Sequence, residues 1–266
     1  VEAVDATHDR FAAFLLDGVT GSGKTEVYLQ LAKRAIERGR QVLILVPEIG
    51  LTPQIVDRVR QRLDAMLVVL HSGLADGARA SAWLAAKAGR GAIVLGTRSA
   101  VFAPLPKLGL IVVDEEHDLS YKQQDGLRYS ARDLALVRAR EAGVPILLGS
   151  ATPSLESLWN VQAGRYHRLQ LRARAAGASP PRLEVVDIRA RVLVGHLSPT
   201  LLTAIGETLA ADQQVLLFVN RRGFAPALLC HACGEVCGCS RCDAKLVLHR
   251  RKGRLQCHHC GLERAV

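Results

Sequence analysis

The chain has 266 residues, of which 49% are hydrophobic and 23% are charged, as is ordinary for a globular protein of one or two domains. Its formal net charge of +10 favours a polyanionic partner, above all nucleic acid, although a generally basic enzyme would show the same balance. The apolar runs are far too short to span a bilayer, and acidic residues near the N-terminus argue against a signal peptide. We therefore expect no membrane association.

The first informative segment is a glycine-rich loop, Gly-Val-Thr-Gly-Ser-Gly-Lys-Thr. Its glycines let successive backbone N–H groups point at phosphate oxygens, and the helix predicted from Thr25 to Arg38 adds its positive N-terminal end. We expect Lys24 to reach the β- and γ-phosphates of ATP and the Thr25 hydroxyl to hold Mg²⁺. The alternative is a glycine-rich turn without a ligand. The predicted nucleotide-binding residues of the loop are Gly18, Val19, Thr20, Gly21, Ser22, Gly23, Lys24 and Thr25.

Short apolar runs alternate with amphipathic stretches over residues 14–164. This repetition predicts an α/β lobe built on a mostly parallel sheet with helices on both faces. Ligands of such sheets bind beyond the carboxyl ends of the strands. The glycine-rich loop and the polar residues after the later strands should therefore share one edge. The predicted strands end near Asp17, Val46, His71, Gly96, Asp114 and Gly149.

An acidic motif, Asp-Glu-Glu-His, begins at Asp114. Asp114 should hold Mg²⁺ through water, and Glu115 should polarise the attacking water, for which it must stay ionised. Glu116 and His117 are placed to couple the site to a neighbouring lobe. The predicted catalytic residues are Lys24, Asp114, Glu115 and His117. The alternative is an ordinary acidic turn between a strand and a helix.

A third motif, Gly-Ser-Ala-Thr, follows a later apolar run. The hydroxyls of Ser150 and Thr152 are small enough to hydrogen-bond the acidic motif and to report the state of the nucleotide. Helix capping after the strand is the simpler alternative, and it is compatible with that role.

A linker should follow at residues 172–182, which are rich in Arg, Ala, Gly and Pro. A second α/β unit should then begin, with strands over 183–186 and 215–219 and a helix over Pro199–Ala210. This unit is too short for a complete domain, and a cysteine-rich segment interrupts it. We predict three parts, which are an ATP-binding lobe at 1–171, the start of a second lobe at 172–229 and a metal-binding insert at 230–266.

All seven cysteines lie between Cys230 and Cys260, mostly in C-x-x-C pairs. Disulfide frameworks spread cysteines along secreted chains, whereas metal sites group them, so we expect a reducing, cytoplasmic location. Two of the pairs form a complete tetrahedral thiolate set for structural Zn²⁺, and a redox-active pair is the main alternative. The four predicted ligands of this site are Cys239, Cys242, Cys257 and Cys260.

Six segments together resemble the PriA family, the bacterial primosomal replication-restart helicases of superfamily 2. The resemblance covers nearly the whole chain. The cysteine-rich insert and a Tyr-Lys-Gln-Gln segment after the acidic motif make it specific. The six segments are Gly18–Tyr28, Leu45–Pro53, Gly96–Phe102, Asp114–Asp118, Gly149–Pro153 and Asn220–Phe224.

This resemblance implies a RecA-like helicase lobe and ATP-driven 3′→5′ translocation on single-stranded DNA, with unwinding of forked DNA at stalled replication forks. It further implies cooperation with other primosome proteins and the single-strand-binding protein, and help in loading the replicative helicase. It also implies a second zinc ion, of which Cys230 and Cys233 would be half the ligand set. Cys237 is not expected from the family pattern.

The resemblance also points to DNA contacts. Physically, tyrosines can stack on bases and basic side chains can meet phosphates, although tyrosines packed against the core are the alternative. Leu127 stands where the family has an aromatic residue, so we expect weaker stacking there. The predicted DNA-binding residues are Thr97, Arg98, Tyr121, Lys122, Arg128 and Tyr129, with Arg132 as a further phosphate contact.

We expect the chain by itself to bind nucleotide weakly and to hydrolyse little, because the later motifs of the second lobe, including its arginine for transition-state charge, are not in this sequence. Two other functions stay open. One is a DNA-dependent translocase that moves without separating strands, and the other is a non-catalytic scaffold that binds nucleotide and zinc.

Overall fold

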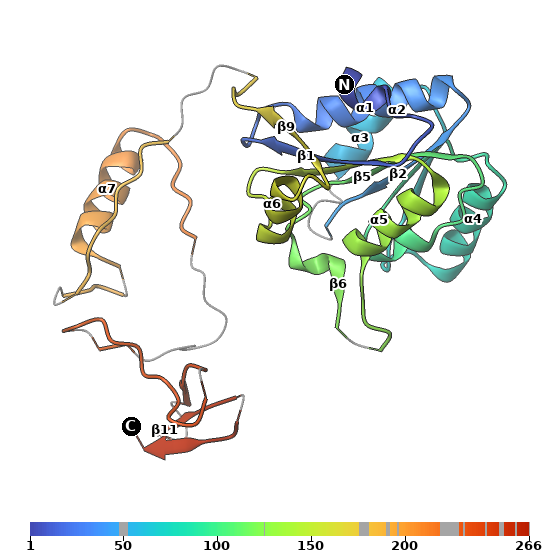
Figure 1. The fold of residues 1–266 in the computed structure, drawn as a ribbon. Coiled ribbons are helices and arrows are strands. Elements are labelled where there is room, and N and C mark those ends of the chain that lie inside the picture. The colour runs from blue at the N-terminus through green and yellow to red at the C-terminus, as the bar shows by residue number, and fades with distance from the viewer. Residues whose placement is uncertain are drawn as a thin grey trace. The chain divides into compact units, whose positions relative to one another are not determined.

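The computed structural model divides into two compact units, Val1–Ser179 and Pro180–Val266, and each is described by itself. The first unit is a layered α/β lobe (Figure 1). The described residues of the second form one helix and a small cysteine-rich sheet. The structure describes residues 1–47, 53–124, 126–175, 181–189, 192–195, 197–218, 229–230, 232–242, 244–249, 253–258 and 260–265.

The centre of the lobe is a seven-stranded sheet in the order β3-β4-β2-β5-β8-β1-β9, and all of its strand pairs are parallel. Its inner strands are almost continuously buried, because helices cover both faces. The strands are β1 Ala12–Gly18, β2 Gln41–Leu45, β3 Leu67–Leu70, β4 Ile93–Gly96, β5 Leu108–Val113, β8 Pro145–Ser150 and β9 His167–Leu171.

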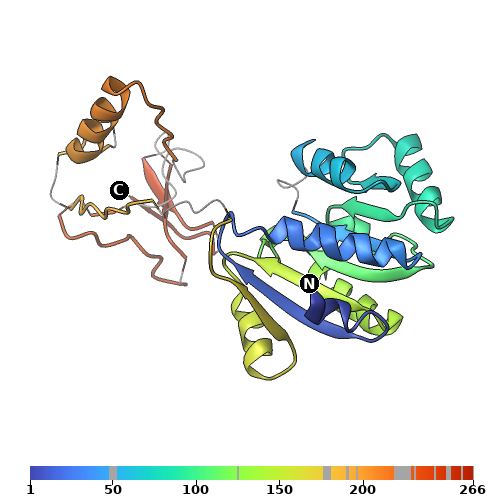
Figure 2. The same ribbon diagram turned by 90° about the horizontal axis from the view of Figure 1, so that it is seen from above.

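Two hydrophobic cores lie on the two faces of this sheet, because successive strand residues point to opposite sides. The core of one face includes side chains of α1, α2 and α3, and that of the other includes side chains of α4, α5 and α6. Figure 2 shows α2 running along the sheet. The helices of the lobe are α1 Glu2–Asp5, α2 Lys24–Glu37, α3 Pro53–Arg62, α4 Asp76–Lys87, α5 Ala131–Ala142 and α6 Leu155–Gln162, with short 3₁₀ turns η2 Arg98–Phe102 and η3 Leu119–Tyr121.

The six predicted strand ends are confirmed to within one residue, and the predicted first helix is confirmed as α2. The carboxyl ends of β1, β5 and β8, which are neighbours in the sheet, therefore meet at one edge. A two-stranded antiparallel hairpin, β6 Lys122–Gln123 and β7 Tyr129–Ser130, projects below the lobe in Figure 1. The sequence did not predict β9 or this hairpin.

In the second unit, the helix predicted over Pro199–Ala210 is confirmed as α7, which begins at the N-cap Ser198. The predicted strand over 183–186 is wrong, and the described part of the predicted strand over 215–219 also forms no strand. Both segments contain the apolar residues typical of strands, but a strand also needs a neighbouring strand to complete its backbone hydrogen bonds. Leu183 is 88% exposed and Leu216 is 93% exposed, so neither packs against a described neighbour.

The cysteine-rich part of this unit is a three-stranded antiparallel sheet, β10 Val247–His249, β11 Arg254–Gln256 and β12 Glu263–Ala265. Its core is small, with only Leu246, Leu255 and Cys257 buried among the residues placed there. Across both units, no described helix is long and apolar enough to cross a membrane.

Candidate nucleotide-binding site and zinc centre

The glycine-rich loop connects β1 to α2 at the carboxyl edge of the sheet. Gly21 and Gly23 have φ angles of 76° and 90°, which disfavour residues with a Cβ. The loop borders a cavity of about 520 Å³ that it shares with Asp114 and Glu115, a size within the usual range of ligand pockets. The Ser22 hydroxyl is buried there without a hydrogen-bond partner. These features fit a phosphate-binding loop.

Lys24 is the first residue of α2, and its side chain folds back over the loop. The amino group donates to the Gly18 carbonyl over 2.9 Å and lies 3.8 Å from a carboxylate oxygen of Glu115. Lys24 is nearly buried, at 9% exposed, so its charge is directed into the cavity. The predicted triphosphate ligand would meet this cation together with the N-terminal end of α2.

Asp114 follows β5 directly and lies opposite the loop. Its Oδ1 atom accepts hydrogen bonds from the Tyr28 hydroxyl at 2.9 Å and from the backbone N–H of Glu115 at 3.1 Å. Burial of the Asp114 carboxyl raises its pKa, and the Tyr28 hydrogen bond works against that rise. A carboxylate oxygen at this position suits Mg²⁺, which prefers hard oxygen ligands.

Glu115 has a left-handed backbone conformation with φ of 44°, which is uncommon for a residue with a Cβ. Its carboxylate lies 3.7 Å from Nδ1 of His117. The same ring contacts the third motif, with Nδ1 2.8 Å from the Ser150 hydroxyl and Nε2 3.3 Å from the Thr152 hydroxyl. The predicted contact between these hydroxyls and the acidic motif is therefore confirmed, and His117 is the residue that makes it.

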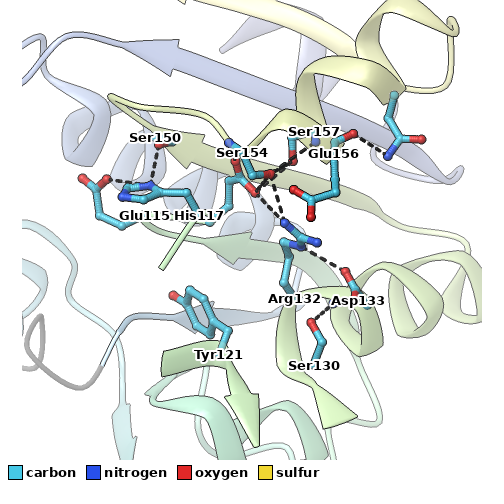
Figure 3. Close-up of polar contacts among 12 residues, drawn as sticks. Glu115, His117, Tyr121, Ser130, Arg132, Asp133, Ser150, Ser154, Glu156 and Ser157 are labelled. Carbon is cyan, nitrogen blue, oxygen red and sulfur yellow. Dashed lines mark hydrogen bonds and ion pairs between the residues drawn. The ribbon is translucent and has the colours of Figure 1, made fainter. Parts of the chain in front are cut away.

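Glu116 is not among the residues that line the cavity, and it is 1% exposed. Figure 3 shows three of its partners, Arg132, Ser154 and Ser157. Its carboxylate accepts a hydrogen bond from Arg132 at 3.2 Å, two from Ser154 at 2.7 and 3.0 Å, and one from the Ser157 hydroxyl at 2.8 Å. Arg132 stands at the start of α5, and the two serines stand at the start of α6. The sequence analysis missed this network, because the partners of Glu116 lie 16 to 41 residues after it in the chain.

This network corrects the prediction for Arg132. Its side chain is 14% exposed and is paired with Glu116 and Asp133, so it does not stand free to meet a DNA phosphate. A buried carboxylate needs such a partner, because an unpaired buried charge is costly.

The structure also corrects the prediction for Tyr121. Its ring is 1% exposed and its hydroxyl donates to the Asp114 carbonyl over 2.6 Å, so it offers no face to a base. The alternative of a tyrosine packed against the core holds here. Tyr129, in contrast, is only partly buried and packs edge-to-face on Phe102, with ring centroids 5.0 Å apart.

The other predicted DNA contacts differ in exposure. Lys122 and Arg128 are exposed on the hairpin and border a hollow of about 600 Å³. Arg98 is half-buried and donates to the carbonyls of Ser120 and Lys122, which fixes the start of the hairpin. Thr97 is buried, at 5% exposed, and does not present its side chain on the surface. Residues 48–52 of the segment Leu45–Pro53 and the whole segment Asn220–Phe224 lie outside the described residues.

The second unit brings four cysteines together as predicted. The Sγ atoms of Cys239, Cys242, Cys257 and Cys260 all lie within 4.8 Å of one another. A tetrahedral zinc–thiolate site with bonds of about 2.3 Å places its sulfurs about 3.8 Å apart, so this donor set fits Zn²⁺. The Cys260 N–H lies 3.5 Å from the Cys257 sulfur, and Gly261 closes the turn at φ of 75°.

The remaining cysteines do not join this cluster among the residues that the structure places. Cys230 and Cys233 are exposed and stand in a tight turn, in which the Gly234 N–H donates to the Cys230 carbonyl. Cys237 packs beside the cluster, and its sulfur is 3.4 Å from a guanidinium nitrogen of Arg264. Whether the first two belong to a second zinc site stays a prediction.

The linker makes a contact that composition did not predict. The Val19 N–H donates to the Leu171 carbonyl, and the Ala175 N–H donates to the Gly21 carbonyl over 2.9 Å. Ala175 also lines the cavity. The segment that leaves the lobe is therefore attached to the phosphate loop.

An α/β lobe with a phosphate loop, an acidic motif and a hydroxyl-bearing third motif at one sheet edge defines the helicase class of nucleotide-binding proteins. The family model described as DEAD/DEAH box helicase matches residues 2–161, and a model described as the PriA DNA helicase Cys-rich region domain matches residues 239–264. The chain belongs to the DEAD/DEAH box helicase family.

Relatives of known name confirm the more specific resemblance to PriA. Each is called replication restart protein PriA. The protein of Haemophilus influenzae is 50% identical over 97% of this chain and 36% of its own length. The protein of Treponema pallidum is 44% identical over 99% of this chain and 40% of its own length. The protein of Bacillus subtilis is 42% identical over 97% of this chain and 32% of its own length. The chain thus spans about a third to two fifths of the length of these relatives.

We expect Asp114→Asn to raise the melting temperature of the nucleotide-free protein in EDTA by a few degrees at pH 7. The raised pKa means that folding favours the protonated carboxyl, so stability is lost as the pH rises through that pKa. Asparagine keeps the acceptor for Tyr28 without the charge. The gain should shrink as the pH is lowered toward the carboxyl's pKa.

Asp57→Asn, on the exposed side of α3, is the matched control and should leave the melting temperature unchanged. A lower melting temperature for Asp114→Asn at pH 7 would show that the charge stabilises the apoprotein.

We expect Cys242→Ser to reduce the zinc content from about one ion per chain to nearly none and to unfold the cysteine-rich sheet, because structural zinc supplies on the order of 10 kcal/mol of folding free energy. Elemental analysis and the NMR signals of β10 to β12 measure the two effects. Cys237→Ser should keep the zinc. Unchanged zinc content and chelator sensitivity in the Cys242 variant would contradict the assignment.

Proposed function

We propose that the protein is part of an ATP-dependent DNA helicase that restarts replication. The observation that carries the proposal is the convergence of Lys24, Asp114 and Glu115 on one cavity, with His117 linking that cavity to the third motif. The identity to the PriA relatives over nearly the whole chain supports DNA as the substrate on which the ATPase acts.

The residues of the cavity have separate roles in this proposal. Lys24 and the N-terminal end of α2 bind the phosphates, while Asp114 and Thr25 hold Mg²⁺, which would neutralise developing charge on the phosphates when bound. Glu115 orients the attacking water and accepts its proton. It is suited to that task because it lines the cavity beside Asp114 and its side chain is 36% exposed, so a water molecule can reach its carboxylate.

His117 couples this chemistry to movement. Its ring lies between Glu115 and the hydroxyls of the third motif, so a shift of Glu115 on hydrolysis changes the hydrogen bonds of Ser150 and Thr152. Since α6 begins just after that motif, the change is passed to a complete secondary-structure element. The hairpin carries Lys122 and Arg128, which we assign to DNA phosphates.

The finer parts of the proposal come from the PriA family. They are 3′→5′ movement on single-stranded DNA, unwinding at stalled forks, and loading of the replicative helicase together with other primosome proteins and the single-strand-binding protein.

We also propose a division into an ATP-binding lobe at 1–171, the start of a second lobe at 172–229 and a zinc insert at 230–266. In this proposal, Cys230 and Cys233 supply half of the ligands of a second zinc site. A role on bacterial DNA places the protein in the cytoplasm.

Lys24→Ala should weaken the binding of a fluorescent ATP analogue by tenfold or more, because the variant has no amino group to form charge-assisted hydrogen bonds with phosphate. Lys33→Ala is the control, since this lysine lies on the same helix but is 66% exposed. Titration by fluorescence anisotropy measures both. Equal affinities for the two variants would overturn the assignment of the phosphate loop.

The double change Lys122→Ala and Arg128→Ala should weaken the binding of an oligothymidine by several-fold. It should also reduce the slope of log affinity against log salt by roughly 0.7 for each phosphate that the protein no longer neutralises. Arg140→Ala on the exposed side of α5 should change neither quantity. An unchanged slope in the double variant would remove the hairpin from the DNA path.

A further inference from the structure

Tyr28 is buried beside the candidate magnesium site and has no role in the mechanism above. It lies one turn after Lys24 on α2, where the apolar pattern of the helix accounts for its ring but not for its hydroxyl. The residue is 2% exposed and packs in the core between α2 and the sheet. A phenylalanine would fill the same space, so the hydroxyl needs a separate explanation.

The hydroxyl of Tyr28 is bound to the acidic motif. It donates to Oδ1 of Asp114 over 2.9 Å, across 86 residues of sequence. The Glu115 N–H donates to the same oxygen. Among the described residues, none donates a hydrogen bond to the second oxygen, Oδ2. The two hydrogen bonds hold one edge of the carboxylate against the protein and leave the other edge for the cavity that Asp114 lines.

The third motif is shaped around the same hydroxyl. A Cβ at Gly149 would lie only 1.7 Å from the Tyr28 oxygen and 2.7 Å from the ring carbon that bears it, so this position cannot hold a side chain while Tyr28 stays in place. The Gly149 carbonyl in turn accepts from the Glu116 N–H over 3.0 Å. Tyr28 therefore touches the carboxyl ends of β5 and β8 from the helix that begins with the phosphate-binding lysine.

We propose that Tyr28 is a positioning residue for magnesium, which orients the Asp114 carboxylate so that Oδ2 faces the ion bound with the nucleotide. The inference rests on the proposed function and extends it by one residue. Hydrogen bonds from outer groups fix the direction of metal-binding carboxylates, and their removal commonly costs 10- to 100-fold in metal affinity or activity. Tyr28 also links the start of α2 to the acidic motif, so the loop and the metal ligand move as one body.

The test compares Tyr28→Phe with the parent chain by titrating Mg²⁺ into the complex with a fluorescent ATP analogue. Affinity for the analogue in EDTA should stay within about twofold. The Mg²⁺ concentration at half-effect should rise by about tenfold, as for other hydrogen bonds that orient a metal ligand. Tyr166→Phe, a partly buried tyrosine elsewhere in the lobe, is the control and should behave like the parent.

A purely structural role for Tyr28 would change the melting temperature or the affinity in EDTA and leave the Mg²⁺ midpoint in place, and that result overturns the inference. If the parent chain binds no nucleotide, the proposed function fails and the inference fails with it. If the parent binds nucleotide and the Phe variant has the parent's Mg²⁺ midpoint, only the inference fails.

Gly149→Ala gives a second, independent test that leaves Tyr28 itself intact. The added methyl group must displace the tyrosine hydroxyl from Asp114, so this variant should reproduce the raised Mg²⁺ midpoint. Gly206→Ala in α7 is the matched control, because a Cβ there meets no atom within 4 Å. A parent-like Mg²⁺ midpoint in Gly149→Ala, at unchanged nucleotide affinity, would also overturn the role of Tyr28.

Discussion

The candidate site depends on the cost of burying carboxylates at the carboxyl end of β5. Glu116 is buried there and Asp114 is partly buried beside the cavity, and a buried charge is tolerated only when hydrogen bonds or an opposite charge compensate it. Glu116 has a complete set of partners, with Arg132 and two serines around it. Among the described residues, donors to the Asp114 carboxylate bind only Oδ1. Because of this difference, Asp114 is suited to bind a metal ion, whereas Glu116 is suited to a structural role.

The two acids also organise the sheet edge around them. Glu116 holds the starts of α5 and α6 at the acidic motif, because both Arg132 and Ser154 bind it. Glu115 follows Asp114 and precedes Glu116 in the chain. Its left-handed backbone conformation directs its side chain toward the cavity and Lys24. The backbone strain at this residue is offset by the hydrogen bonds of its two neighbours, so the position of the proposed catalytic group is set by residues that do not react.

The sheet could be predicted from the sequence because strands buried on both faces are continuous apolar runs, and polar residues mark where each run ends. The glycine-rich loop and the cluster of four cysteines could be recognised in the sequence because phosphate-binding loops and zinc sites require fixed spacing of their residues. Burial in the short 3₁₀ turn before the hairpin could not be predicted in this way. Tyr121 was expected on the surface, yet it is buried with its hydroxyl on the Asp114 carbonyl. A short loop has no periodic sequence pattern from which the burial of its side chains can be judged. A hydrogen bond between residues far apart in the chain, such as Tyr28 and Asp114, also leaves no pattern in the sequence around either residue.

The two compact units depend on different sources of stability. The lobe has two extensive hydrophobic cores, so it needs no metal to hold its sheet. Among the described residues of the cysteine-rich sheet, three are buried in its core, one of them the proposed zinc ligand Cys257, and so small a core cannot offset the entropy of ordering its strands. We therefore expect the fold of this sheet to depend on zinc, and the candidate nucleotide cavity, whose described lining residues all belong to the first unit, to keep its geometry without the metal. In the proposed function, removal of zinc would therefore separate the contribution of the insert to DNA binding from the hydrolysis of ATP.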